Sequence, residues 1–166
     1  MGALLSLIVV SQLTGCVITP SLSVDNQDAG ANSPPAVIAV RGEQSELPEL
    51  GTVVFVPGEG SLNVELIDTD LLDTLYVRVF VDYQLDAPKP ARSTCTAAST
   101  GDVKRTVTCD ATALCQELDV GKLLDMNVKV FDRALLETGT PLFQAMPEGG
   151  LSTGKVFHLD CKRSGT

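Results

Sequence analysis

Alternation of apolar and polar residues with a period of two runs through most of this chain and constrains its fold more than any other feature. Successive side chains of a β-strand point to opposite faces, so this alternation predicts strands with one buried face. In residues 62–66, Leu62, Val64 and Leu66 share one face, and Asn63 and Glu65 share the other. The predicted strands are residues 36–40, 52–56, 62–66, 75–83, 103–109, 127–131 and 155–159.

Turn-forming residues separate the predicted strands and indicate the fold class. Pro, Gly and Asp gather at residues 57–60, 86–88 and 147–150, and these residue types favour turns. Only residues 111–118 have the composition of a short helix. Seven short strands without a long helical period predict an all-β, antiparallel, two-sheet sandwich over residues 36–166. Because the chain has no Trp and only 4% aromatic residues, we expect an aliphatic core.

The amino-terminal segment has the pattern of a cleaved leader. Residues 2–10 form an uncharged apolar run that is too short for a transmembrane helix, which needs about 20 residues. The following Leu13-Thr14-Gly15-Cys16 resembles the lipobox of bacterial lipoproteins. This resemblance implies that Cys16 is linked to diacylglycerol, that residues 1–15 are removed, and that the new amino terminus is acylated. The alternative is an apolar strand that ends in Cys16.

The resemblance also implies a location. In that family an Asp after the lipidated Cys retains the protein at the inner membrane, so Val17 favours the outer membrane. Two or three acyl chains give stable anchoring, whereas one chain binds only marginally. Residues 16–35 are rich in Pro, Ser, Asn, Asp and Gly, which is typical of a flexible linker between the anchor and the domain.

The net charge of −9 restricts the possible partners. Residues 1–15 contain no ionisable side chain, so the whole charge belongs to the mature part. The 12 basic residues are dispersed rather than gathered in a stripe, and binding of nucleic acid needs such a stripe to neutralise phosphates. The sequence therefore predicts no nucleic-acid partner, and membrane attachment has to come from the acyl chains because an acidic surface repels anionic lipid.

Four cysteines remain once Cys16 is assigned to lipid. An even number on the oxidising side of a membrane predicts two disulfides, and three pairings are possible. Zinc is the competing interpretation, but no C-x₂₋₄-C pair is present, and redox catalysis lacks a C-x-x-C pair. The disulfide candidates are Cys95, Cys109, Cys115 and Cys161.

The sequence offers little for catalysis. His158 is the single histidine, and no G-x-S-x-G motif supplies a nucleophile for it. The glycines of residues 58–61 do not form a phosphate-binding motif. Asp68, Asp70 and Asp73, with Asp82 further along, are weak calcium candidates without the glycine and distal Glu of an EF-hand loop. We expect a solvated acidic loop there, no cofactor and no enzymatic activity.

Residues 67–82 resemble a stretch of immunoglobulin-like modules on bacterial surface proteins, in which an acidic turn precedes a central strand. The resemblance implies an immunoglobulin-like sandwich and a role in adhesion rather than a reaction. We therefore expect a structural or protein-interaction module, lipid-anchored in the cell envelope at the periplasmic face or the cell surface, with an envelope protein as its partner. The alternatives are a small-ligand or carbohydrate-binding module and an accessory subunit of an envelope enzyme. A concave aromatic patch around Tyr76, Phe80 and Tyr83 favours ligand binding, and a flat polar face favours a scaffold.

Overall fold

The structure of the protein is a computed structural model that describes residues 32–43 and 45–165. The predicted leader, the lipobox with Cys16 and the predicted linker as far as residue 31 lie outside the described residues. The described residues form one compact unit.

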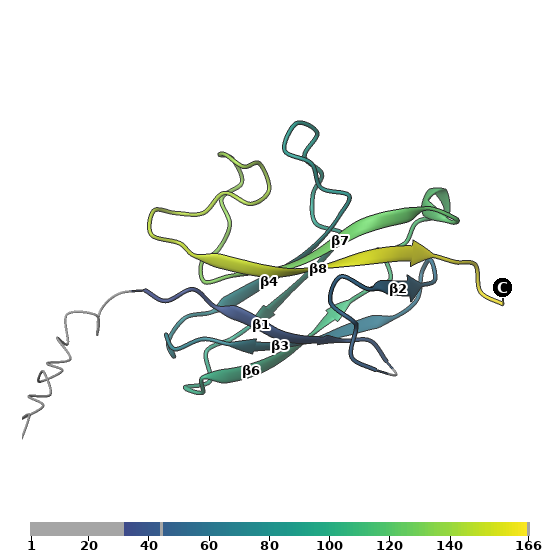
Figure 1. The fold of residues 1–166 in the computed structure, drawn as a ribbon. Coiled ribbons are helices and arrows are strands. Elements are labelled where there is room, and N and C mark those ends of the chain that lie inside the picture. Colours follow the sequence, from purple (N-terminus) through teal and green to yellow (C-terminus); the bar gives the residue numbers. More distant parts are fainter. Residues whose placement is uncertain (1–31, 44, 166) are drawn as a thin grey trace, which may run out of the picture. The chain divides into compact units, whose positions relative to one another are not determined.

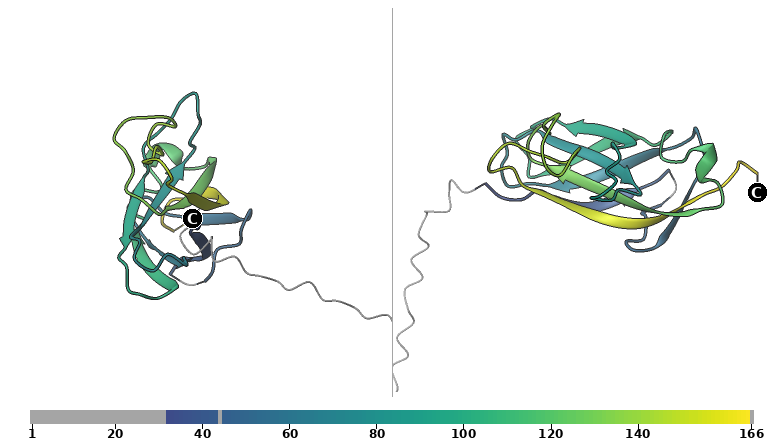
Figure 2. Two further views of the ribbon diagram at one scale, coloured as in Figure 1. Left: turned by 90° about the vertical axis from the view of Figure 1, so that its left-hand side faces the viewer. Right: turned by 90° about the horizontal axis from the view of Figure 1, so that it is seen from above.

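Two β-sheets face each other across an apolar core, which confirms the all-β sandwich (Figure 1). The three-stranded sheet has the order β1-β3-β6, and all its pairs are antiparallel. The five-stranded sheet has the order β2-β8-β7-β4-β5. Figure 2 shows the two layers along the strands and from above. The bounds are β1 (Ala36–Arg41), β2 (Thr52–Phe55), β3 (Ser61–Ile67), β4 (Leu75–Val81), β5 (Ser93–Ala97), β6 (Lys104–Asp110), β7 (Leu123–Phe131) and β8 (Ser152–Cys161).

The strand order is similar to that of an immunoglobulin sandwich. Strands A, B and E lie in one sheet of that fold, and strands G, F, C and C′ lie in the other. Here β1, β3 and β6 have the places of A, B and E, and β8, β7, β4 and β5 have those of G, F, C and C′. The disulfide between strands B and F of antibody domains has no counterpart, because the bridges of this chain lie elsewhere.

The sheets differ from the prediction in two details. The described residues form eight strands rather than seven, because β5, with the sequence Ser-Thr-Cys-Thr-Ala, lacks an apolar alternation that would have revealed it. The sandwich is also not wholly antiparallel, since β2 runs parallel to β8. The chain crosses from the three-stranded sheet after β1 to the edge of the five-stranded sheet, where β2 takes the direction of β8.

The segment 111–118, which had the composition of a short helix, forms turns and the start of a short 3₁₀ helix, η2 (Glu117–Asp119). Side chains bind the backbone groups that a longer helix would have used. Arg92 donates to the carbonyl of Leu114 at 2.7 Å, and the Asp119 carboxylate accepts the N–H of Gln116 at 3.0 Å. Arg92 and Asp119 also form an ion pair. These bonds hold the β6–β7 connection in an irregular path.

The core is mainly aliphatic, as the composition predicted. On β3 the alternation places Leu62, Val64 and Leu66 at 0% exposure. Full burial of such a side chain stabilises the fold by about 1.5–3 kcal/mol. The other strands contribute Val37, Val40, Val53, Leu75, Val77, Val79, Val81, Met126, Val128, Val130, Phe157 and Leu159 to the same cluster.

The two disulfides select one of the three possible pairings. Cys95–Cys109 joins β5 to β6, which are the edge strands of the two sheets, with a Cα–Cα distance of 5.1 Å. Cys115–Cys161 joins the β6–β7 connection to the end of β8, with a Cα–Cα distance of 5.6 Å. Because all four cysteines are bridged, none is a thiolate available to zinc.

The last residues of the predicted linker contact the domain. The backbone N–H of Ser33 donates to the Asp70 carboxylate at 2.7 Å, and the hydroxyl of Thr153 donates to the carbonyl of Pro35 at 2.5 Å. Asn32 donates to the carboxylate of Asp132. Ordered contacts of the domain therefore begin before β1.

The two bridges differ in the length of chain that they close, so they should differ in their contribution to stability. Their sequence separations are 46 residues for Cys115–Cys161 and 14 for Cys95–Cys109. In the chain-entropy model these loops correspond to about 4 and about 3 kcal/mol. We expect Cys115→Ala/Cys161→Ala to lower the free energy of unfolding in urea more than Cys95→Ala/Cys109→Ala does. A larger loss for the second pair would contradict this account.

Candidate functional site

The acidic turn between β3 and β4 is built around a buried arginine. Arg105 is 4% exposed, and its guanidinium donates to the backbone carbonyls of Asp70, at 3.0 Å, and of Asp73. Its Nε donates to the carbonyl of Asp102 at 3.3 Å. Oδ1 of Asp68 accepts the N–H of Asp70 at 3.0 Å. A protein cation therefore occupies the centre of this turn and binds its backbone oxygens.

Of the four acidic residues singled out from the sequence, Asp68, Asp70 and Asp73 lie near one another in this turn, and Asp82 lies apart from them. Asp82 follows β4 at its far end and pairs with Lys89 at 2.6 Å, while Asp70 binds the backbone of Ser33. Within residues 32–43 and 45–165, no group of three or more His, Cys, Asp and Glu is arranged to hold a metal ion. The expected solvated loop is also wrong in part, because Asp68 is only 2% exposed.

The buried position of Asp68 changes the pKa of its carboxyl. Burial raises the pKa of its carboxyl, and the nearby Asp70 and Asp73 act in the same direction, while the N–H of Asp70 and the charge of Arg105 oppose the shift only in part. Its Oδ2 is buried without a hydrogen-bond partner among the described residues. Ionisation of Asp68 therefore costs more free energy in the folded protein than in the unfolded chain.

This shift predicts a pH dependence of stability. A carboxyl whose folded-state pKa lies above its unfolded-state pKa binds its proton more tightly in the fold. The free energy of unfolding therefore falls as the pH rises through the interval between these two pKa values. The interval begins at about 3.8. We expect the stability of the wild type, relative to Asp68→Asn, to decrease as the pH is raised from below this value, in urea unfolding at several pH values. The exposed Asp86→Asn is the control, and an equal trend for it would contradict the assignment.

The aromatic residues of the sequence prediction do not form an open concave patch. Phe80 is 1% exposed and packs edge-on against Tyr83, with ring centroids 5.1 Å apart. The Tyr83 hydroxyl donates to the carbonyl of Leu142 at 2.7 Å, which links the β4–β5 connection to the β7–β8 connection. These two connections project from the five-stranded sheet (Figure 1). The aromatic side chains therefore help to pack loops onto the outer face of that sheet.

Two cations lie side by side on the same outer face. Arg78 of β4 is paired in register with Lys129 of β7, and neither forms an ion pair within the described part of the chain. Burial lowers the pKa of Arg78, an effect that Tyr76 opposes, and burial also lowers the pKa of Lys129. The ammonium of Lys129 donates to Gln144 at 2.6 Å. Lys129 thus ties the β7–β8 connection to the sheet.

His158 lies on the exposed side of β8. Its Nδ1 is 3.2 Å from a carboxylate oxygen of Asp125 on β7, and the two side chains are 43% and 72% exposed. No Ser, Thr or Cys side chain is hydrogen-bonded to this pair among the described residues. The arrangement is an exposed contact between an imidazole and a carboxylate on a sheet surface.

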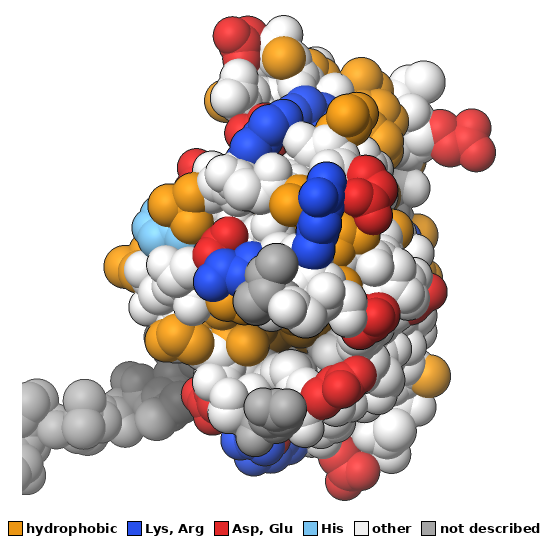
Figure 3. Space-filling model, turned by 90° about the vertical axis from the view of Figure 1, so that its right-hand side faces the viewer, with side chains coloured by type: hydrophobic (Ala, Val, Ile, Leu, Met, Phe, Trp, Pro, Cys, Tyr) orange, Lys and Arg blue, Asp and Glu red, His pale blue; other side chains and the backbone are white. Residues whose placement is uncertain are grey.

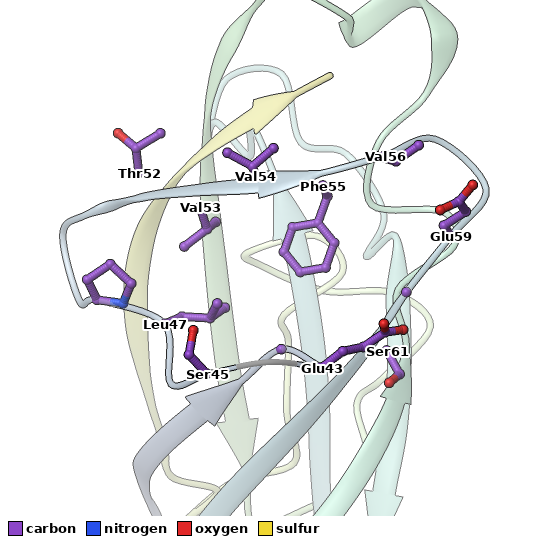
Figure 4. Close-up of a pocket in the computed structure, with 13 residues that line it drawn as sticks. Glu43, Ser45, Leu47, Thr52, Val53, Val54, Phe55, Val56, Glu59 and Ser61 are labelled. Atoms are coloured by element: carbon purple, nitrogen blue, oxygen red, sulfur yellow. The ribbon is translucent and has the colours of Figure 1, made fainter. Parts of the chain in front are cut away.

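A pocket of about 450 Å³ opens beside β2, where the sequence indicated no site. It lies between the β1–β2 connection, β2 and the β2–β3 turn (Figure 4). Leu47, Val53 and Phe55 point into it, and Glu43 and Glu59 lie at its rim. Figure 3 views this end of the domain, where apolar side chains are exposed between acidic and basic ones. The lining of the pocket is thus mixed: aliphatic and aromatic side chains lie beside polar groups and two carboxylates.

The strand beside this pocket has one unpaired edge. The carbonyls of Gly51 and Phe55 accept the N–H groups of His158 and Lys162 on the β8 side, at 2.9 and 3.0 Å. Because backbone groups alternate along a strand, those of Thr52 and Val54 point away from β8. No described residue pairs with them. Val54 is an apolar residue at 53% exposure on this edge strand, and it is the signal that sequence reasoning missed.

No model of a known protein family matches this chain, and no curated protein sequence is significantly similar to it. The function of the site therefore has to follow from its own geometry.

Proposed function

We propose that this protein is a lipid-anchored module of the bacterial cell envelope that acts in protein interaction or as a structural element. The anchor is Cys16, and the location is the outer membrane, at its periplasmic face or at the cell surface. The observation that carries the proposal is the pairing of Cys95 with Cys109 and of Cys115 with Cys161. Disulfides persist in oxidising compartments outside the cytoplasm.

The cysteine pairing also supports the role of Cys16. The chain contains five cysteines, and the two bridges use the four that follow Cys16. Cys16 therefore has no cysteine left within the chain with which to pair, and it stands directly after the small residues of the lipobox pattern. In the described part of the chain, no helix is long and apolar enough to span a bilayer.

Binding of another protein is the role that the surface supports best. Phe80 is buried, Tyr83 packs against it, and Arg78 lies over the ring of Tyr76. The aromatic residues therefore do not favour the ligand-binding alternative, in which a carbohydrate would stack on an open ring. His158 faces an exposed carboxylate and no nucleophile, so the surface does not favour catalysis. The unpaired edge of β2 and its pocket are suited to contact with another chain.

Lipidation predicts a specific effect of substitution at the lipobox. We expect Cys16→Ser to move the protein from the membrane fraction to the soluble fraction when it is expressed in a bacterial host, because serine cannot form the thioether to diacylglycerol. Thr14→Ser, which keeps a small residue in the lipobox, should leave the protein with the membranes. Intact mass measurement of the wild type should show loss of residues 1–15 and addition of acyl chains. Continued sedimentation of Cys16→Ser with membranes would refute the anchor.

A further inference from the structure

We infer that the free edge of β2 receives an extended segment of a partner protein as an added strand, with an aliphatic side chain of that segment in the adjoining pocket and a basic residue beside it. This inference rests on the proposed function as an interaction module, and it names the surface and the chemistry of the partner.

The backbone of β2 supplies the docking edge. Thr52 and Val54 direct their N–H and C=O groups away from β8, and no described residue accepts or donates there. Unpaired groups at a sheet edge are a template for a further strand, and main-chain hydrogen bonds then provide affinity. The outer edge of β1 differs, because the Glu46–Leu47 segment pairs with Arg41 and with the carbonyl of Val40. The end of β1 nearest the pocket is therefore covered, whereas the outer backbone groups of Thr52 and Val54 on β2 are not.

The pocket determines what the incoming strand carries. Side chains of a paired strand alternate between the faces of the sheet, so every second residue of the segment points to the same side as Val53 and Phe55. That side is the interior of the pocket, which also contains Leu47 (Figure 4). A volume of about 450 Å³ admits an aliphatic side chain, and such a side chain gains free energy by leaving water.

The negative charge at the rim of the pocket favours some partner segments over others. Glu43 and Glu59 are exposed at the rim and have no ion pair among the described residues. A basic residue in the partner segment is therefore favoured by both carboxylates. A second copy of this chain is disfavoured, because pairing two β2 strands would bring together two acidic rims of molecules with a net charge of −9 each.

The dimensions of β2 limit the contact to a short segment. The strand has four residues, and Pro57 follows soon after it. Proline and short length are the usual protections of an edge strand against uncontrolled pairing. The expected contact is thus local and reversible, in agreement with recognition of a short extended peptide rather than formation of a continuous sheet.

A substitution at Val54 tests the inference. Proline is tolerated on an edge strand where the lost N–H faced solvent, so Val54→Pro removes the docking N–H without removing a bond to β8. The probe is a labelled peptide, acetyl-Lys-Val-Thr-Val-Thr-Lys-amide, added to the purified full-length chain. We expect the wild type and Val54→Thr to bind the probe and Val54→Pro to bind at least tenfold more weakly. Exchange of the Val54 amide hydrogen should slow when the probe is added.

Changes to the probe provide a test that does not depend on folding of the variant. A peptide with Pro in place of the second of its two Val residues should bind the wild type at least tenfold more weakly. A peptide with Glu in place of both Lys residues should also bind at least tenfold more weakly. The inference is overturned if the wild type does not bind the probe at millimolar concentration, if Val54→Pro retains both its disulfides and full binding, or if the Pro peptide binds equally. Dimerisation of the wild type that Val54→Pro abolishes would instead identify a second copy as the occupant. Membrane release by Cys16→Ser is independent of these outcomes, so the anchor and the docking edge fail separately.

Discussion

The structure depends on burial of one aliphatic face of each sheet against the other. Val64 and Leu66 of the three-stranded sheet and Val77, Val79 and Val128 of the five-stranded sheet are all at 0% exposure. No Trp is present to fill space, so the core relies on close packing of small branched side chains, whose χ1 angles are restricted in strands. This packing determines the register of every central strand, because a slip of one residue would turn the apolar face to solvent.

Covalent and polar contacts then close the ends and one side of the sandwich. Cys95–Cys109 ties together edge strands that belong to different sheets and share no hydrogen-bonded ladder. The connections are held mainly by buried charged groups that bind backbone atoms: Arg105 organises the β3–β4 turn, and Asp132 accepts the N–H of Leu151 at 2.8 Å in the β7–β8 connection. A buried charge is tolerated when hydrogen bonds replace the lost water. The long loops of this small domain are thereby fixed to its two layers.

Another molecule can bind only to the surface that these contacts leave exposed. Phe80 is buried against Tyr83, and Tyr76 and Tyr83 are only half-buried, so the aromatic residues leave no fully exposed ring on that face. The switch of the chain from one sheet to the other after β1 has the opposite effect, because it leaves β2 with one paired edge, one open edge and a pocket beside it. The same crossover that completes the five-stranded sheet thus creates the candidate site.

The sequence by itself determined the fold class, most strands and the presence of two disulfides among Cys95, Cys109, Cys115 and Cys161, because the period of two and the number of cysteines are local or countable properties. Five of the predicted segments overlap β1, β2, β3, β4 and β6 closely, whereas β7 was recognised only in its second half and β8 only in its middle. Only the tertiary structure decided the disulfide pairing, the burial of Asp68, the polar strand β5 and the open edge of β2. Each of these depends on which distant segments become neighbours, and that depends on the packing of the two sheets rather than on any local pattern.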